Sequence, residues 1–204
     1  MSGKWIGAKY YNDVNRYTQQ NNNATENIMK LLETCGPSSA VNCYDATHST
    51  PLPSCRLGNG EMQVEDAFTM VMNNVPRYND DMLKQVAGLD PARYPANEVI
   101  GYYPYFAKLC FNAKVELWNG GCTNRFKDVF KRIPGCAIQG WLYSPNHFIC
   151  IKGYEEDSDH FLTNDPWNGR GSVHGFNRQL PFDGLDENIH DPFLVWYPQE
   201  YDGR

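Results

Sequence analysis

The feature that most constrains the fold is a cysteine at the predicted start of a buried helix, in residues 34–45 (TCGPSSAVNCYD). Gly36 frees the backbone after Cys35, Pro37 suits the first helical turn, and the small and apolar residues that follow can be buried. Unpaired N–H groups and the positive end of the helix macrodipole stabilise a thiolate at such a position. The pattern predicts Cys35 as a nucleophile, although a cysteine here can also be only a small buried hydrophobe.

Composition and charge restrict the classes of partner. The chain has 204 residues and a formal charge of −6, and its Lys and Arg residues are scattered. This argues against a nucleic acid or an anionic membrane surface. The apolar runs fall short of the roughly 18 residues that a membrane span needs, and the first residues show no secretory signal. We therefore expect one monomeric domain over residues 1–204, made in the cytoplasm, with no nucleic-acid partner and no membrane span.

The cysteines indicate neither a disulfide framework nor a zinc site. There are seven, an odd number, and none of their spacings gives a CxxC pair. Cys43, Cys110 and Cys150 lie in apolar surroundings that suit buried thiols, and only Cys35 has the setting of a helix start. We expect no cofactor and no metal.

The order of the predicted elements is helices first and antiparallel strands second, which indicates an α+β fold. Apolar spacing predicts helices at residues 63–73, 99–111 and within 120–135, and residues 77–97 are expected to form a loop or a short helix. β-Branched and aromatic residues predict strands at 136–142, 147–154, 160–164 and 193–197, and residues 113–117 (AKVEL) resemble a further short strand. The division is a helical half of about 26–133 and a sheet half of about 134–200.

A general base is needed beside a catalytic thiol, and the chain offers His48, His147, His160, His174 and His190. The strand that starts at His147 turns at residues 155–159 (EEDSD) and returns through 160–165 (HFLTND), which predicts a hairpin. A turn centred near residue 156 puts Asp165 opposite His147, with Cβ atoms about 4.5–5.5 Å apart. Asp165 is then predicted to orient the ring and to stabilise its imidazolium. The other four histidines have no comparable partner.

Acyl transfer also needs hydrogen-bond donors where negative charge develops on the carbonyl oxygen. The backbone N–H of Cys35 can supply one donor. A side-chain amide upstream can supply the other, and the candidates are Gln19 and Gln20.

Taken together, these motifs resemble papain-like cysteine peptidases, specifically the group related to peptidases that trim double-glycine bacteriocin leaders. In that group an xQxxN stretch precedes a T-C-(G/N)-x-(T/S)-(S/A) helix, and a GH(F/I)xxVxGY strand precedes an xNDP(W/Y)xG strand. The similar stretches here are TQQNN, TCGPSS, NHFICIKGY and FLTNDPWNG, within roughly residues 17–45 and 134–170. The resemblance implies a papain-like fold, in which the helix carrying the nucleophile packs on an antiparallel sheet.

The same resemblance assigns roles to individual residues. It implies Cys35 as the nucleophile, His147 as the base, Asp165 as the orienting acid and Gln19 as the oxyanion-hole donor. The sequence departs from the pattern at Asn146, where the group has glycine. The glutamine also lies further from the cysteine than in papain, so Gln20 stays an alternative to Gln19.

The middle of the chain, residues 60–73 (GEMQVEDAFTMVMN) and 97–111 (NEVIGYYPYFAKLCF), is similar to phage- and prophage-encoded members of this group, which act as cell-wall peptidases. The resemblance implies an endolysin whose partner is a peptidoglycan stem peptide and which a phage lysis system releases to the cell wall. Two alternatives stay open. One is a protease that cleaves proteins, and the other is a catalytically silent papain-like module that binds peptides.

Overall fold

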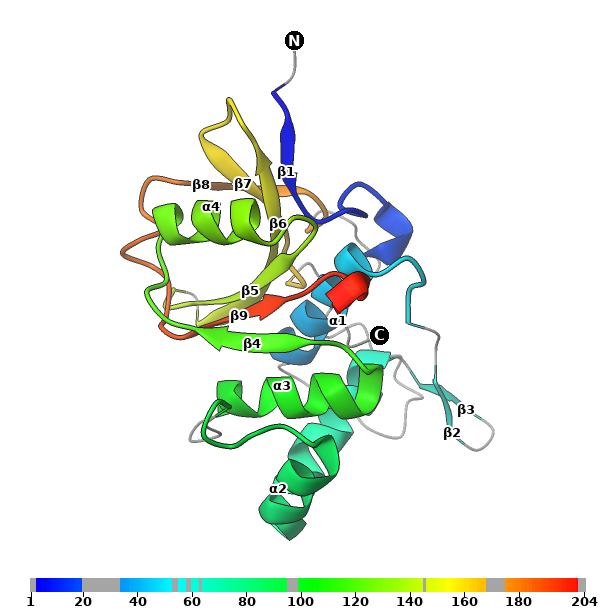
Figure 1. Ribbon diagram of the computed structural model, residues 1–204. Coiled ribbons are helices and arrows are strands. Elements are labelled where there is room, and N and C mark those ends of the chain that lie inside the picture. Colours follow the sequence, from blue (N-terminus) through cyan, green and yellow to red (C-terminus); the bar gives the residue numbers. More distant parts are fainter. Residues whose placement is uncertain are drawn as a thin grey trace.

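The computed structural model describes residues 3–19, 34–52, 55–57, 60–62, 64–94, 99–144, 146–167 and 175–201. Within these residues one antiparallel sheet is formed by β1 (Trp5–Gly7), β4 (Val115–Trp118), β5 (Ala137–Leu142), β6 (His147–Glu155), β7 (His160–Asn164), β8 (Arg178–Pro181) and β9 (Phe193–Trp196). The strand order is β4-β9-β5-β6-β7-β8, and β1 pairs with β6 (Figure 1).

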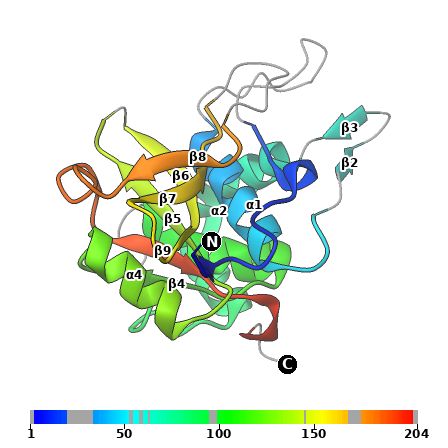
Figure 2. The same cartoon turned by 90° about the horizontal axis from the view of Figure 1, so that it is seen from above.

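Helices cover both faces of this sheet. α1 (Cys35–Thr47), α2 (Val64–Ala87) and α3 (Tyr103–Phe106) lie on one side, and α4 (Thr123–Arg132) lies on the other (Figure 2). The shorter described elements are η1 (Val14–Arg16), η2 (Val99–Tyr102), η3 (Ala107–Phe111), η4 (Gln199–Tyr201) and the antiparallel pair β2 (Cys55–Leu57) and β3 (Gly60–Met62). The expected α+β fold, with a helix that begins at Cys35 packed on an antiparallel sheet, is confirmed.

The central strands are apolar on both faces because neighbouring residues of a strand point to opposite sides of the sheet. In β9, Phe193 and Val195 belong to the apolar cluster that contains the α4 side chains. Leu194 and Trp196 belong to the other cluster, with residues of α1, α2 and α3. α1 is therefore an inner layer of the core, which fixes the position of its first residue relative to the sheet.

Three expectations about the elements were wrong. The helix expected at residues 63–73 continues to Ala87, so residues 77–87 are not a loop. A break was expected because of the prolines that follow, but the buried side chains of Leu83 and Ala87, one turn apart, pack the last turns on the core. β4 overlaps the short strand expected at residues 113–117, but β4 and β1 both join the sheet although they lie outside the expected sheet half, and no strand was expected where β8 forms. The helical turns at residues 99–111 and the helix after residue 120 form as expected.

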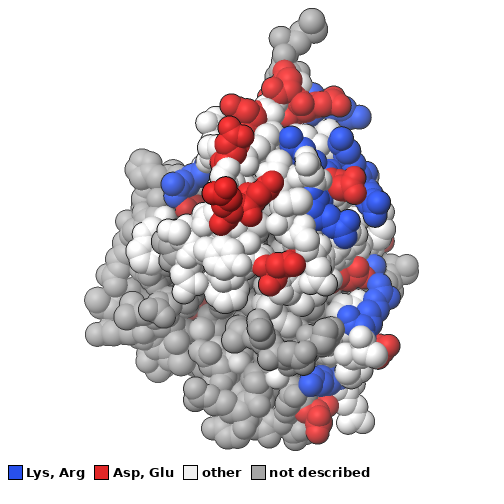
Figure 3. All heavy atoms as spheres, turned by 90° about the vertical axis from the view of Figure 1, so that its left-hand side faces the viewer, with Lys and Arg blue, Asp and Glu red and all other residues white. Residues whose placement is uncertain are grey.

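The surface shown in Figure 3, which is the side of the molecule at the left of Figure 1, carries acidic and basic side chains together. The described part of this face therefore carries both signs of charge, in keeping with the scattered Lys and Arg residues of the sequence. No helix in the described ranges is both long enough and apolar enough to cross a membrane.

Candidate active site

The first turn of α1, which presents Cys35, is fastened to the sheet by one buried glutamine of β5. The Gln139 side-chain amide donates to the Gly36 carbonyl oxygen at 2.9 Å and to Ser39 Oγ at 2.8 Å. Its own carbonyl oxygen accepts a hydrogen bond from the Trp196 indole of β9 at 3.0 Å. Because a buried amide is costly unless its hydrogen bonds are made, these contacts hold the start of the helix in one position.

Gly36 is required by packing rather than by backbone freedom. A Cβ atom at this position would lie 2.1 Å from the Tyr103 hydroxyl oxygen and 3.6 Å from the Phe148 ring. Tyr103 comes from α3, is 1% exposed, and packs against the rings of Phe68 and Phe148. A side chain after Cys35 therefore has no room unless the helix start or Tyr103 moves.

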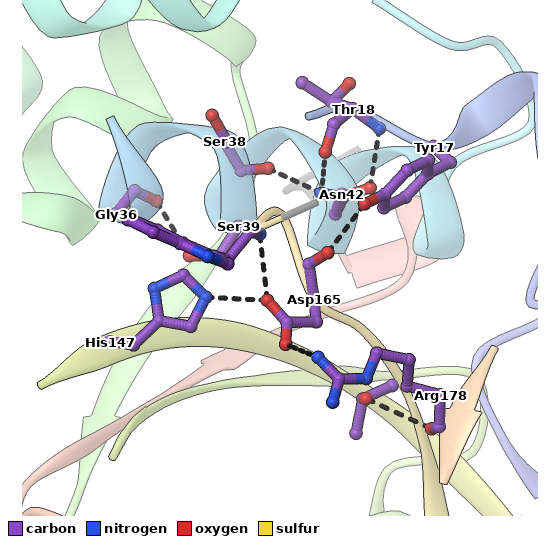
Figure 4. Close-up of polar contacts among 11 residues, drawn as sticks. Tyr17, Thr18, Gly36, Ser38, Ser39, Asn42, His147, Asp165 and Arg178 are labelled. Atoms are coloured by element: carbon purple, nitrogen blue, oxygen red, sulfur yellow. Dashed lines mark hydrogen bonds and ion pairs between the residues drawn. The ribbon is translucent and has the colours of Figure 1, made fainter. Parts of the chain in front are cut away.

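His147 and Asp165 are directly hydrogen-bonded. Nε2 of the ring lies 2.7 Å from Oδ1 of the carboxylate (Figure 4). The same ring interacts with the Cys35 thiol and lowers its pKa. Cys35 at the start of α1, His147 at the start of β6 and Asp165 just after β7 are therefore brought together, as the sequence predicted.

The register that joins these two residues differs from the expected one. Cys150 pairs with Asn164, so continuing the ladder brings residue 167, rather than Asp165, opposite His147. The register shifts at Lys152, where β6 contains one extra residue and forms a bulge. On the turn side of the bulge Gly153 pairs with Leu162, so the turn is centred between residues 157 and 158 rather than near 156, and the bulge moves the register back by one residue. The resulting offset of two residues keeps the two side chains on the same face, whereas an offset of one would have put them on opposite faces. Asp165 thus reaches His147 diagonally.

The backbone of Asp165 is held from both sides. Its N–H donates to the Gly175 carbonyl at 2.9 Å, and its carbonyl accepts from the Tyr17 hydroxyl at 2.6 Å (Figure 4). Residues 17–19, which follow η1, are called the N-terminal arm here. The backbone N–H and carbonyl of Thr18 in this arm each form a hydrogen bond with the buried Asn42 side chain of α1, at 2.9 Å and 2.8 Å. The arm therefore joins the nucleophile helix to the segment that carries the carboxylate.

The electrostatics favour a thiolate–imidazolium pair. Burial raises the pKa of the Cys35 thiol, but hydrogen bonds from His147 and from the Phe148 backbone outweigh burial and bring this pKa below its ordinary value. Burial lowers the pKa of His147, but the bonds to Asp165 and Cys35 raise it to about 9. Burial likewise raises the pKa of Asp165, while His147 and the Trp167 N–H lower it below its usual range. The carboxylate is thus ionised and the ring is poised to carry a proton at neutral pH.

The remaining histidines in the described residues lie elsewhere. His48 stacks on Tyr44 at the end of α1, His160 contacts Asp159, and His190 stacks on Trp141. His174 lies outside the described residues.

The proposed oxyanion glutamine has no established place. Gln19 follows Thr18 and so lies on the arm beside α1, and among the described contacts none joins its amide to Cys35. Its role stays a prediction. Gln20 lies outside the described residues.

Two expectations about the other cysteines were wrong. Cys43 and Cys150 are buried as expected, but Cys110 is exposed at the end of η3. Cys35 is also not alone at a helix start, because Cys122 is the N-cap of α4 and its sulfur accepts a hydrogen bond from the Arg125 N–H at 3.4 Å. What distinguishes Cys35 is therefore the adjacent histidine.

Sequence reasoning missed three residues that support the site: Gln139, Tyr103 and Arg178. Gln139 left a signal, since it is the one polar side chain within the apolar strand CAIQGWL. Tyr103 and Arg178 left none, because their roles depend on which elements meet in three dimensions. Within the described residues no three His, Cys, Asp or Glu side chains gather in a group that could hold a metal ion.

A cysteine at the start of a buried helix, hydrogen-bonded to a histidine that a carboxylate orients, is the arrangement of papain-like cysteine peptidases. The comparison with protein families agrees with this class. The model of the Peptidase_C39-like family matches residues 11–179, and the chain belongs to this family. It is accordingly a cysteine peptidase, a hydrolase of peptide bonds. No curated protein matches the chain.

Proposed function

We propose that Cys35, His147 and Asp165 form the catalytic triad of this peptidase. The observation that carries the proposal is the His147 ring, which bonds Asp165 at 2.7 Å and is close enough to the Cys35 thiol for each to shift the pKa of the other. The Cys35 thiolate attacks the carbonyl carbon of the scissile bond, and the His147 imidazolium gives its proton to the leaving amine. Water then attacks the thioester while His147 takes a proton from the water, which releases the carboxylic acid and restores the thiolate–imidazolium pair.

The tetrahedral intermediates of both steps carry negative charge on the former carbonyl oxygen. The backbone N–H of Cys35, at the start of α1, can serve as one hydrogen-bond donor of an oxyanion hole. We assign the second donor to the side-chain amide of Gln19. The attachment of Thr18 to Asn42 keeps the arm that carries Gln19 against α1.

The substrate we propose is a peptidoglycan stem peptide, so that the protein acts as a phage-type endolysin, made in the cytoplasm and released to the wall by a lysis system. The resemblance of residues 60–73 and 97–111 to phage-encoded cell-wall peptidases supports this choice. Trp167 is 61% exposed. Its ring lies edge-on to the His147 ring, with the two ring centroids 6.1 Å apart, and so offers an apolar surface beside His147. An exposed aromatic ring of this kind can pack against the side chain of a short peptide bound at the site.

Digestion of purified peptidoglycan sacculi tests the substrate. Wild type and Cys35→Ala are incubated with sacculi and, in parallel, with an unfolded protein such as casein. We expect new free amino groups and shortened stem peptides with wild type only. Intact sacculi together with cleaved casein would refute the endolysin and favour a protein-cleaving protease. Binding of peptides without cleavage of either substrate would favour a silent peptide-binding module.

A further inference from the structure

The Asp165 carboxylate has a second polar partner besides the histidine. Its Oδ1 accepts from His147 and from the Trp167 N–H, at 2.7 Å and 2.9 Å. Its Oδ2 accepts from Nη1 of Arg178 at 2.5 Å (Figure 4). The carboxylate is 14% exposed, whereas the Arg178 side chain is 54% exposed. Both oxygens of a nearly buried acid are thus engaged, and the second one is engaged by an arginine of β8.

The strand register explains why Arg178 can reach the acid. Arg178 lies directly opposite Thr163 in the β7–β8 ladder, and its carbonyl accepts from Thr163 Oγ1 at 3.1 Å. Asp165 is two residues beyond Thr163 and therefore on the same face. Diagonal neighbours of this kind have Cα atoms about 7–8 Å apart, which a long side chain can span. The backbone of Arg178 is held by the sheet while its guanidinium extends to Asp165.

All three groups around the carboxylate are hydrogen-bond donors. A carboxylate accepts on both oxygens, whereas an asparagine has one accepting oxygen and an NH₂ group that only donates. With the asparagine oxygen turned toward His147, its NH₂ faces the Arg178 guanidinium. With the amide turned round, the NH₂ faces His147 and the Trp167 N–H. One donor therefore meets another in either orientation.

We propose that Arg178 is a positioning residue of the active site, which holds the second carboxylate oxygen of Asp165 and makes aspartate, rather than asparagine, the group that fits there. The inference rests on the proposed triad and extends it to a fourth side chain. Arg178 acts through Asp165 on the orientation of His147, and it does not contact the reacting atoms. Its contribution should consequently depend on which residue stands at position 165.

The test is a double-mutant cycle between positions 165 and 178, with Arg178→Met, Asp165→Asn and the double variant. Arg132→Met is the matched control, because Arg132 is also exposed and paired with an aspartate, Asp128, but lies on α4. Two rates are measured for each variant. One is kcat/KM for a peptide that the wild-type protein cleaves, and the other is the rate at which iodoacetamide alkylates Cys35 at pH 6–7, which needs no substrate. Thermal unfolding of each variant excludes loss of folding as the cause of any change.

We expect Arg178→Met to lower both rates by roughly 3- to 10-fold, as for loss of a partly exposed charge-assisted hydrogen bond. In the Asp165→Asn background the same change should leave both rates unchanged or raise them, because it removes the opposing donor. Arg178→Lys should retain most activity, since a single N–H to Oδ2 contact is what the geometry requires. Equal effects of Arg178→Met in both backgrounds, or an effect no larger than that of Arg132→Met, would overturn the inference.

The two readouts separate this inference from the proposed function. If the alkylation rates show coupling between positions 165 and 178 but no peptide is cleaved, the hydrolytic role is refuted and the positioning role of Arg178 stands. Cleavage that depends on Cys35 without such coupling would refute only the role of Arg178.

Discussion

The contact between Gly36 and Tyr103 gives a prediction that the structure makes quantitative. In Gly36→Ala the new Cβ would lie 2.1 Å from the Tyr103 hydroxyl oxygen, more than an ångström inside ordinary contact. Tyr103 is buried and cannot turn away. We expect overpacking to cost about 1–3 kcal/mol of unfolding free energy, which lowers Tm by roughly 2–12 °C for a chain of this size. A displacement of Cys35 by about 1 Å should reduce kcat/KM by about 100-fold.

Removal of the Tyr103 hydroxyl should relieve this clash. In Gly36→Ala/Tyr103→Phe the nearest ring atom would be Cζ, at 3.4 Å, which is ordinary contact. Tyr103→Phe alone removes only the hydroxyl group, leaves Gly36 in place and should keep most activity. The assay measures kcat/KM, the rate of Cys35 alkylation and Tm for the three variants. Full activity of Gly36→Ala, or a double variant no more active than Gly36→Ala, would refute the packing argument.

The remaining predictions concern reactivity and pH. At pH 7 iodoacetamide should alkylate Cys35 much faster than Cys122, because both lie at helix starts but Cys35 has a histidine beside its thiol. Peptide mapping by mass spectrometry measures the two rates, and equal rates would contradict the prediction. Since His147 must hold the proton that the leaving amine receives, kcat/KM should fall as pH rises through about 9, and a profile still rising at pH 10 would be inconsistent with that role. Burial raises the pKa of Asp45 to about 7, although the Leu52 N–H and Arg16 lower it. Between pH 4 and 7 the unfolded chain therefore ionises while the folded protein keeps this proton, so folding loses stability as pH rises. In Asp45→Asn the side-chain oxygen can still accept from the Leu52 N–H. The unfolding free energy of this variant should exceed that of wild type by up to a few kcal/mol at pH 8 and equal it near pH 4. Denaturant titration at the two pH values measures the difference.

The sequence predicted well the features that depend on local chemistry and on the alternation of side chains between the two faces of a strand. Cys35 begins its helix because the residues around it favour a helix start, and His147 faces Asp165 because a pleated hairpin keeps alternate residues on one face. The exact register could not be predicted, since the hairpin turn is centred between residues 157 and 158 instead of near 156, and the bulge at Lys152 then adds a residue to β6. The end of α2 was also missed, because the packing of Leu83 and Ala87 on the core outweighs the local signal for a break.

Residues that support the site from other elements were beyond sequence reasoning. Tyr103 closes the space above Gly36 only because α3 packs against the start of α1. Arg178 reaches Asp165 only because β8 pairs with β7 in one particular register. Gly36 illustrates the difference, since the sequence suggested backbone freedom as the reason for a glycine after Cys35, whereas the structure shows a close contact with Tyr103.

The central claim is that Cys35 is the nucleophile of a peptide hydrolase, and isotope labelling of the products tests it most directly. Wild type and Cys35→Ala are incubated in water enriched in ¹⁸O with a mixture of stem peptides and unstructured peptides, and the new carboxyl termini are analysed by mass spectrometry. The mechanism predicts ¹⁸O in every new carboxylate with wild type, and no new termini with Cys35→Ala. New termini formed by a folded Cys35→Ala protein at the wild-type rate would contradict the claim.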